Sequence, residues 1–493
     1  MYTYIVIIIV YLVALTIYNF YQARKVKTQD DMMVAGRSLG VTKMVFTLVC
    51  TWIGSGTFIA GAEYAYRAGW SSLWMPAGAW VGIAIIYFLA GKIRTFGQYT
   101  IGDILEERYG KFARLFGAFA LIIAFTTIVS YQFRAGGYIL NVITDGAVSV
   151  EVGQALAAGF VILFTSIGGM IAVAHTDLPN GIIIMLACIV SVPFVVATAG
   201  GLGAPAEVLP ASHMLLVSPE FGQYPFLKAF SYFLATMFLL LGVQSMYQKF
   251  YSARTAGDAK KAVLLWIVGT ILVETVIVVI AIYAASYYWS GHITIDPAAV
   301  VLYAARDMVP APVGLLLLGA AVVVVISTGM NYLLSPSTNI MRDVYQRFIN
   351  PDAPQSTMVA MQKVLIVVLG LVAFLLIFIP TVMNLEISVL KYAYFAYTIY
   401  GVAITPALLA ALAWKRATKA GGLASIISGT IMVITFDLLI PYIFPQIMIG
   451  EDPWGIPSIY PALIVSIGML IIVSYATPKP DKSVLAKLFP EKI

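Results

Sequence analysis

The stretch MVFTLVCTWIGSGTFIAGAEYAY, residues 44–66, decides how this chain folds. It is apolar over a length close to the roughly 20 residues that a helix needs to cross a bilayer. Its centre, TWIGSGT at residues 51–57, combines glycine with hydroxyl side chains, a composition that weakens a helix. We therefore predict a membrane-crossing helix that is interrupted part of the way along.

Apolar runs of the same kind continue along almost all 493 residues, of which 61% are hydrophobic and only 11% charged. Soluble domains carry roughly 25% charged residues, and the strands of a membrane barrel would alternate apolar and polar residues. The sequence therefore predicts an all-α polytopic membrane protein and not an enzyme. The expected transmembrane helices, about 13 in number, are 2–22, 44–66, 71–91, 115–140, 153–173, 179–200, 229–248, 262–288, 312–334, 359–381, 388–414, 421–444 and 458–476.

Lys and Arg residues gather on one side of these spans. If the N-terminus is outside, 24 of the 29 fall on the cytoplasmic side, with Lys249 in a cytoplasmic loop, and cytoplasmic loops carry such an excess. We predict an N-out, C-in, multi-pass protein of the cell membrane, in contact with the lipid bilayer. The net charge of +6 does not indicate nucleic acid binding, because the basic residues lie in short loops and not on a soluble face.

The second to sixth and the seventh to eleventh spans form two sets of five. An odd number of spans inverts the second set relative to the first, and inverted repeats with broken helices are typical of secondary transporters. The seventh span is also interrupted, by GVQS at residues 242–245. The expected parts are an extra helix and cytoplasmic loop (1–43), a first inverted repeat (44–200), an extracellular loop (201–228), a second repeat (229–414), and two C-terminal helices with a cytoplasmic tail (415–493).

The ninth span carries oxygen ligands that suit sodium. Val324, Ser327 and Thr328 share one helix face by their i, i+3, i+4 spacing, and could supply one carbonyl and two hydroxyls. Facing the break in span two, they could share an ion with the carbonyls of Thr51 and Gly54, since membrane sites use unwound backbone as ligand. The alternative is that the two hydroxyls merely bond to the preceding helical turn.

At these residues the sequence resembles the sodium/solute symporter family, which includes sodium/proline, sodium/galactose, sialic acid and high-affinity choline symporters. The resemblance implies a LeuT-like fold and alternating access driven by sodium, and it places the family's common sodium site on Thr51, Gly54, Val324, Ser327 and Thr328. It runs over nearly the whole chain. The stretches that carry it are AGRSLG (35–40), GGMIAV (168–173) with Thr176-Asp177, IST (326–328) with LLS (333–335) and RDVY (342–345), and WKRATKAG (414–421).

The resemblance also bears on the number of ions. Some members bind another sodium through serines one turn further along span nine and an aspartate that matches Asp177. Here Met330 and Asn331 stand at the serine positions. We therefore expect one sodium per solute, with Asp177 acting as a gate or structural cap at the cytoplasmic end.

The solute itself is less constrained. Trp52 lies in a Thr-Trp-Ile-Gly context similar to that of the choline symporter, and aromatic boxes suit quaternary ammonium, but Ile128 replaces that symporter's tryptophan in span four. The intramembrane Arg134 could instead clamp a carboxylate, unless it forms an ion pair with Glu63 or Glu274. The candidate substrate-binding residues are Trp52, Ser55, Phe58, Gln132, Arg134, Gln244 and Tyr397.

The function we predict is sodium-coupled import of a small organic solute, preferably one that bears a carboxylate, such as an amino acid or a monocarboxylate. The alternatives are a quaternary ammonium solute such as choline or betaine, and proton coupling through Glu274. Sodium is the expected coupling ion, and no cofactor or transition-metal site is expected, because Cys and His do not cluster. No pore-loop motif suggests a channel. The sequence does not indicate an oligomeric state.

Overall fold

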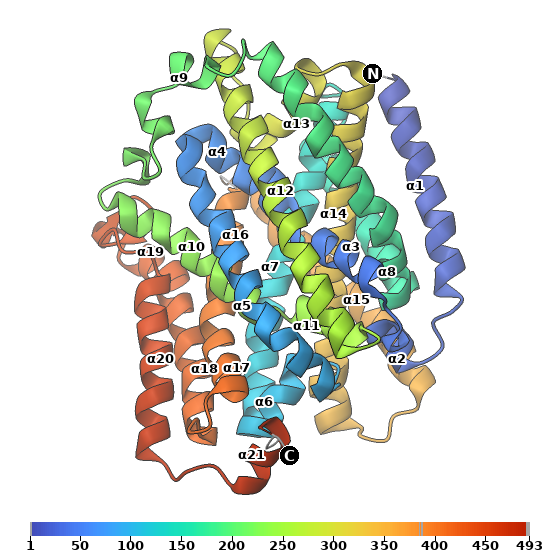
Figure 1. Cartoon of the computed structure of the whole chain (residues 1–493), viewed down its shortest axis with the longest axis vertical. Coiled ribbons are helices and arrows are strands. Elements are labelled where there is room, and N and C mark those ends of the chain that lie inside the picture. Colours follow the sequence, from blue (N-terminus) through green and yellow to red (C-terminus); the bar gives the residue numbers. More distant parts are fainter. Residues whose placement is uncertain (1, 384, 386–387, 490–493) are drawn as a thin grey trace.

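The computed structural model describes residues 2–383, 385 and 388–489, and these residues are mostly helical (Figure 1). The α-helices are α1 (Tyr2–Ala23), α2 (Gln29–Val34), α3 (Val41–Trp52), α4 (Ala62–Ala68), α5 (Trp74–Phe96), α6 (Ile101–Tyr109), α7 (Lys111–Ile143), α8 (Val150–Thr198), α9 (Ala204–Val208), α10 (Pro225–Gly242), α11 (Gln244–Ser252), α12 (Ala256–Ser290), α13 (Val300–Asp307), α14 (Ala311–Asn339), α15 (Gln355–Val382), α16 (Val389–Ala403), α17 (Thr405–Ala413), α18 (Lys419–Ile434), α19 (Ile440–Ile443), α20 (Ile459–Ala476) and α21 (Lys482–Leu488).

Short segments of other kinds link or extend these helices. The π-helical segments are η2 (Gly56–Gly61), η7 (Ile340–Ile349) and η8 (Thr435–Leu439). The 3-10 segments are η1 (Ala35–Arg37), η3 (Gly69–Leu73), η4 (Ala211–Met214), η5 (Pro219–Phe221), η6 (Pro297–Ala299) and η9 (Pro445–Ile447). Two short strands, β1 (Met448–Ile449) and β2 (Asp452–Pro453), pair antiparallel.

The described residues contain eleven helical runs that are long and apolar enough to cross a membrane. These runs, together with α3, contain the thirteen predicted spans to within a few residues, which confirms the all-α membrane class. Two runs hold two predicted spans each, the run 56–96 and helix α8. The chain leaves helical geometry inside each of them, at Gly69 (φ 60°) and at Gly169 (φ 56°). The number of crossings and the orientation stay predictions.

The bend at Gly169 divides α8 into two parts with different neighbours. A straight helix of 49 residues would be about 74 Å long, far more than a bilayer core. Before the bend, Ile162 packs on Gly370 of α15, and after it Gly181 packs on Phe46 of α3. The sequence predicts the division between residues 173 and 179. It occurs earlier because only glycine adopts this left-handed conformation readily.

Both predicted helix breaks are confirmed. Helix α3 ends at Trp52 and helical structure resumes with η2 at Gly56. Helix α10 ends at Gly242 and α11 begins at Gln244. The breaks therefore occupy matching positions, at the first member of each predicted five-helix repeat.

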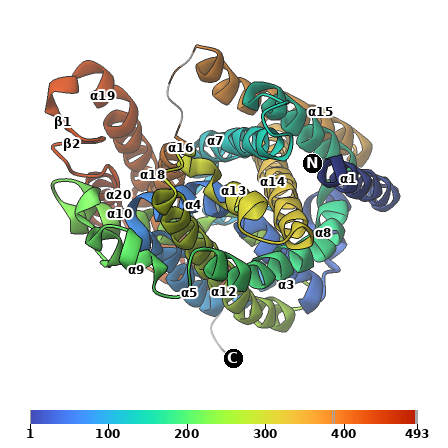
Figure 2. The same ribbon diagram turned by 90° about the horizontal axis from the view of Figure 1, so that it is seen from above.

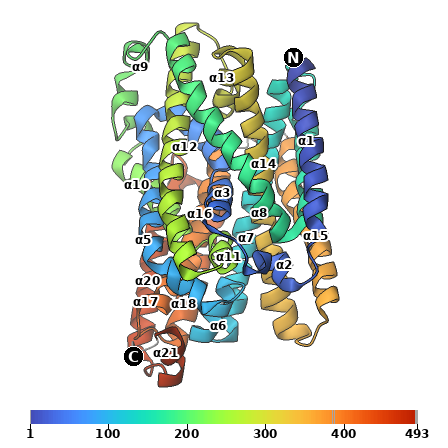
Figure 3. The ribbon, with the colours of Figure 1, turned by 45° about the vertical axis from the view of Figure 1, so that its right-hand side comes forward.

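The helices are bundled side by side along the long axis of the molecule, with α1 and α20 on opposite outer edges (Figures 1, 2 and 3). Helix α1 packs on α8, and α18 packs on both α20 and α16. Helix α1 begins at one end of the long axis and α21 lies at the other (Figure 3). We call the end that holds α2, α6 and α21 the basic end, and the end that holds α9 and α13 the α9 end.

Candidate functional site

The break after α3 exposes backbone carbonyls to α14. The last carbonyls of a helix have no partner within that helix, and here Thr328 Oγ1 donates to the carbonyls of Cys50 (2.9 Å) and Ile53 (3.0 Å). The predicted pair was Thr51 and Gly54. The carbonyl of Gly54 instead accepts the N–H groups of Thr57 and Phe58 at 3.0 Å each, because the next helical segment starts there.

Gly54 is nevertheless central to the site. A Cβ atom at this position would lie 2.7 Å from Thr328 Cγ2 and 3.1 Å from Gln132 Nε2. The next residue, Ser55, donates its backbone N–H to Gln132 Oε1 at 3.1 Å. A side chain at residue 54 would therefore separate the broken helix from both α7 and α14.

On α14, Ser327 and Thr328 are buried and point to different partners. While Thr328 reaches the broken helix, Ser327 Oγ donates to Asp177 Oδ1 at 2.7 Å and accepts from Asn180 Nδ2 at 2.9 Å. Val324 is completely buried one turn earlier. The structure thus brings one of the two predicted hydroxyls, that of Thr328, to the break in α3, and the carbonyls that it contacts lie one residue earlier than predicted.

Asp177 lies in a buried polar cluster on the basic-end side of this site. Its carboxylate accepts from Thr47 Oγ1 (2.5 Å), from Ser327, and from Asn331 Nδ2 (3.3 Å). Asn331 Oδ1 in turn accepts from Lys249 Nζ at 2.6 Å. The side chains of this cluster come from α3, α8, α11 and α14.

The placement of Lys249 in a cytoplasmic loop was wrong. Lys249 belongs to α11, all nine residues of which are buried, and it has no exposed surface. The available signal was its position. Only three residues separate Lys249 from the break at 242–245, and it directly follows residue 248, the predicted end of span seven. Its composition, QSMYQKFYS, is polar enough to suggest a loop.

A second set of residues forms a small pocket on the other side of the broken segment. Its volume is about 30 Å³, which is about the volume of one water molecule. Glu274 is the one charged residue in its lining. The lining residues are Trp52, Gly56, Thr57, Gly61, Ser72, Met75, Pro76, Thr236, Glu274, Ile277, Val278 and Tyr397.

Glu274 is held by two indoles. Its Oε1 accepts from Trp52 Nε1 at 2.9 Å and its Oε2 from Trp80 Nε1 at 2.7 Å, and the side chain is buried. Within the described ranges, no Lys or Arg lies within ion-pair distance of it. Tyr397, on α16, closes the pocket beside Gly56, where a Cβ atom would clash with the tyrosine hydroxyl.

Among the predicted substrate-binding residues, Trp52 and Tyr397 line this pocket, and Ser55, Phe58 and Gln132 are buried around the break without lining it. Gln244 lies elsewhere: its Oε1 accepts the N–H of Ile101 at 2.6 Å, near α6.

Arg134 does not line the pocket either. Its guanidinium lies over the ring of Tyr138, 5.0 Å from the centroid. The pairings considered for it do not form among the described residues, since Glu63 binds Arg67 at 2.9 Å and Glu274 binds the indoles. Arg134 and Tyr138 are one helical turn apart on α7 and therefore share a helix face.

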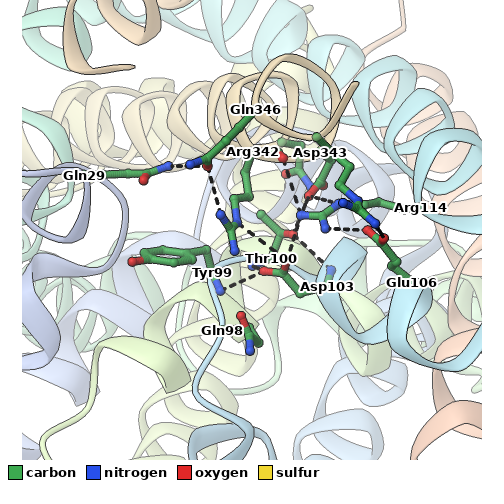
Figure 4. A network of polar contacts seen from close by, with 12 residues as sticks. Gln29, Gln98, Tyr99, Thr100, Asp103, Glu106, Arg114, Arg342, Asp343 and Gln346 are labelled. Atoms are coloured by element: carbon green, nitrogen blue, oxygen red, sulfur yellow. Dashed lines mark hydrogen bonds and ion pairs between the residues drawn. The ribbon is translucent and has the colours of Figure 1, made fainter. Parts of the chain in front are cut away.

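At the basic end, a network of ion pairs joins α6, α7 and η7 (Figure 4). Arg114 binds Asp103 at 2.7 Å, Glu106 at 2.7 Å and Asp343 at 2.6 Å. Burial alone would raise the pKa of Glu106, but the hydrogen bonds and charges of Arg114 and Arg347 hold this pKa below its usual value. The network was not predicted as a site, although RDVY at 342–345 supplies part of it.

The network borders a cavity of about 480 Å³ at the same end. Arg342 Nη1 donates to Gln346 Oε1 at 2.9 Å, and Gln346 Oε1 accepts from Gln29 Nε2 at 3.2 Å (Figure 4). Thr100 Oγ1 donates to Asp343 at 2.7 Å. These contacts tie α2, α6 and the segment after α14 together across the basic end.

Comparisons with known proteins agree with this architecture. The model of the sodium:solute symporter family matches residues 32–429. The osmoregulated proline transporter of Bacillus subtilis is 26% identical over 96% of this chain and 95% of its own. The sodium/pantothenate symporter of Escherichia coli is 26% identical over 97% and 98%, and the sodium/proline symporter of that organism is 25% identical over 87% and 86%.

Solved structures show the same fold. A sodium-coupled sialic acid symporter, in a substrate-bound outward-open state, superposes with a TM-score of 0.82 at 15% identity, over 97% of this chain and 98% of that one. MhsT in complex with L-phenylalanine gives a TM-score of 0.55 at 14% identity, over 92% of this chain and 99% of that one. The fold is LeuT-like, and the family match covers most of the sequence. The chain therefore belongs to the sodium:solute symporter family.

Proposed function

We propose that this sodium-coupled symporter carries a small solute with a positively charged nitrogen, such as an amino acid or a betaine. Sodium-coupled symport of a small organic solute follows from the family, and the class of solute is our inference. The observation that carries it is Glu274, a buried carboxylate in the pocket beside the helix break, which is held by Trp52 and Trp80 and, over the described ranges of the chain, by no Lys or Arg.

The chemistry of this pocket favours a cation. A buried carboxylate is stabilised by an opposite charge, and indole and phenol rings attract cations through their faces. Trp52 and Tyr397 supply such rings beside Glu274. A solute nitrogen entering the pocket would complete the charge pair that the protein leaves open.

The negative charge of Glu274 narrows the class of carboxylate-bearing solutes that the sequence predicts. A plain monocarboxylate would bring a second negative charge to Glu274 with no Lys or Arg in the lining. An amino acid keeps the carboxylate and adds the cation, and two of the relatives above are proline transporters. Choline satisfies the same charge requirement and stays a second candidate because of the aromatic lining.

Sodium would bind on the other face of the same broken segment. The carbonyls of Cys50 and Ile53 converge on Thr328 Oγ1, with the Ser327 hydroxyl on the same helix. This set offers oxygen alone, which suits a hard cation. Because Trp52 lies between the two carbonyls in sequence, an ion that orders this segment would also order the pocket, which gives a direct route for coupling.

Transport also requires the basic end to open. The Arg114 network and the contacts of Gln29 and Gln346 hold that end together. With the basic end in the cytoplasm, as the charge distribution predicts, this network would separate before the solute is released inward. The 480 Å³ cavity beside it would be part of the exit path.

A solute panel tests the proposal. Purified protein in detergent would be heated with proline, other amino acids, glycine betaine, choline, lactate or pantothenate, each with sodium and with potassium as its replacement. We expect sodium-dependent thermal stabilisation and uptake for one of the solutes with a cationic nitrogen, and none for lactate. Sodium-dependent binding of lactate or pantothenate alone would contradict the role given to Glu274 and leave sodium symport in place.

A further inference from the structure

Lys249 is a fully buried cation with no carboxylate in contact with it among the residues that the structure describes. Its Nζ donates to Asn331 Oδ1 at 2.6 Å and to the carbonyl of Ser245 at 3.4 Å. In the part of the chain that the structure describes, no acidic group lies within 4 Å of it. Burying an unpaired ammonium is expensive, so a balancing charge is required nearby.

That charge is Asp177, reached through one amide. Asn331 accepts from Lys249 with its oxygen and donates with its nitrogen to Asp177 Oδ2 at 3.3 Å. The ammonium, the amide and the carboxylate form one chain that links α11, α14 and α8. The rest of the Asp177 carboxylate accepts from the hydroxyls of Thr47 and Ser327, which carry no charge.

The hydrogen bonds among Lys249, Asn331 and Asp177 also occupy oxygens that a second sodium ion would need as ligands. Sodium beside Asp177 would require several free oxygens. Asn331 Oδ1 is taken by Lys249, Ser327 Oγ donates its proton to the carboxylate, and Met330 offers a thioether in place of an oxygen. The positive charge at Asp177 is therefore supplied from within the protein.

We propose that Lys249 is a tethered cation that takes the place of a second coupling ion at Asp177 and limits the symporter to one sodium per solute. This inference rests on the proposed sodium symport and deepens it. Lys249 acts as a positioning residue, since it touches neither the solute pocket nor the carbonyls of Cys50 and Ile53. It holds Asn331 and Asp177, and through them Ser327, in place for the sodium site.

The test replaces the Lys249 ammonium with a set of ligands for a second sodium ion. The variant Lys249→Met/Met330→Ser/Asn331→Ser removes the ammonium and restores hydroxyl ligands around Asp177. In proteoliposomes, the Hill coefficient for sodium should rise from about 1 in the wild type to about 2, and the ratio of charge to solute should rise from one to two. Lys249→Arg should keep the wild-type values, and Lys261→Met, an exposed lysine of α12, is the matched control.

Distinct results would overturn the inference. A Hill coefficient near 2 in the wild type would show that a second ion binds despite Lys249, and would leave sodium symport intact. A coefficient of 1 in the triple variant, with wild-type uptake, would show that Lys249 does not set the ion count. Loss of all sodium dependence in the wild type would instead overturn the proposed function. If the triple variant fails to fold, Lys249→Met/Asp177→Asn removes both charges, and we expect it to fold with a coefficient of 1; a coefficient of 2 there also contradicts the inference.

Discussion

Asp177 and Glu274 are buried carboxylates near the break in α3, and their surroundings differ in charge. Asp177 accepts three side-chain hydrogen bonds and is balanced by Lys249 through Asn331. Glu274 accepts two indole N–H groups and faces a pocket that contains no basic residue. Lys249 supplies the balancing charge for Asp177. For Glu274, the balancing charge would come from a cation that enters the pocket.

The difference teaches where to look for a ligand. Intramembrane ionisable residues usually pair or serve a function, but burial alone does not tell which. A carboxylate with an internal cation contributes to the stability and geometry of its neighbours. A carboxylate that has hydrogen bonds and no charge partner, next to a cavity, has capacity left for a cation.

The largest effect is expected when the charge pair of Asp177 and Lys249 is broken. Asp177→Asn should lower the free energy of unfolding by about 3–5 kcal/mol, because it leaves the ammonium of Lys249 buried without a balancing charge. Adding Lys249→Met should restore most of the loss, as measured by thermal unfolding in detergent and a double-mutant cycle. Additive losses in the double variant would show that the two charges do not interact.

The second-largest effect is expected at Glu274, the carboxylate that faces the pocket. Glu274→Gln keeps one acceptor oxygen in place of two, so one indole N–H loses its acceptor, which should lower the free energy of unfolding by about 1–3 kcal/mol. It should also weaken binding of the cationic solute by about 10- to 150-fold, about 1.5–3 kcal/mol, the usual range for a hydrogen bond to a charged group. Isothermal titration with saturating sodium would measure it. The control is Glu207→Gln, at an exposed acid in α9. Unchanged affinity in Glu274→Gln would erase the contrast with Asp177.

A smaller effect tests the proposed sodium site at Thr328. Thr328→Ala removes the hydroxyl that contacts both free carbonyls, and should raise the sodium concentration for half-maximal uptake at least about tenfold, about 1.4 kcal/mol. Thr328→Ser keeps the hydroxyl and should stay within about twofold of the wild type. Normal sodium activation in Thr328→Ala would remove this oxygen from the ion site.

The smallest effect is expected at Arg134, a cation that pairs with neither Asp177 nor Glu274. Arg134 has no ion-pair partner among the described residues and does not line the pocket. Arg134→Gln should therefore lower the free energy of unfolding by only about 0.5–1 kcal/mol, the value of its contact with the Tyr138 ring, and leave solute affinity within about twofold. A hundredfold loss of affinity would instead restore the carboxylate clamp that the sequence suggested.

Much of this architecture could be predicted because it depends on local composition. The length of the apolar runs matches the thickness of a bilayer, and glycine weakens helices wherever it occurs. The breaks after Trp52 and Gly242 therefore followed from residues 51–57 and 242–245. The bend at Gly169 was misplaced by a few residues, because the apolar pattern continues through it without change.

Lys249 shows why the site could not be completed in this way. Counting charges assigns a lysine at the end of an apolar span to a loop, and that rule is sound for most of the basic residues here. The partner that makes burial tolerable, Asp177, lies 72 residues earlier and is reached only through Asn331 of another helix. No single stretch of the sequence indicates that these two charges balance each other.

The sequence by itself determined that this protein spans a membrane, where two of its helices break, and that Ser327 and Thr328 offer two hydroxyls on one turn of α14, because each of these depends on residues that are neighbours along the chain. Only the tertiary structure decided that Cys50 and Ile53 present the carbonyls, that Trp52 and Trp80 hold Glu274, and that Lys249 balances Asp177. These contacts join helices that are distant in sequence, and the pairing of buried charges depends on where the helices pack and not on their composition.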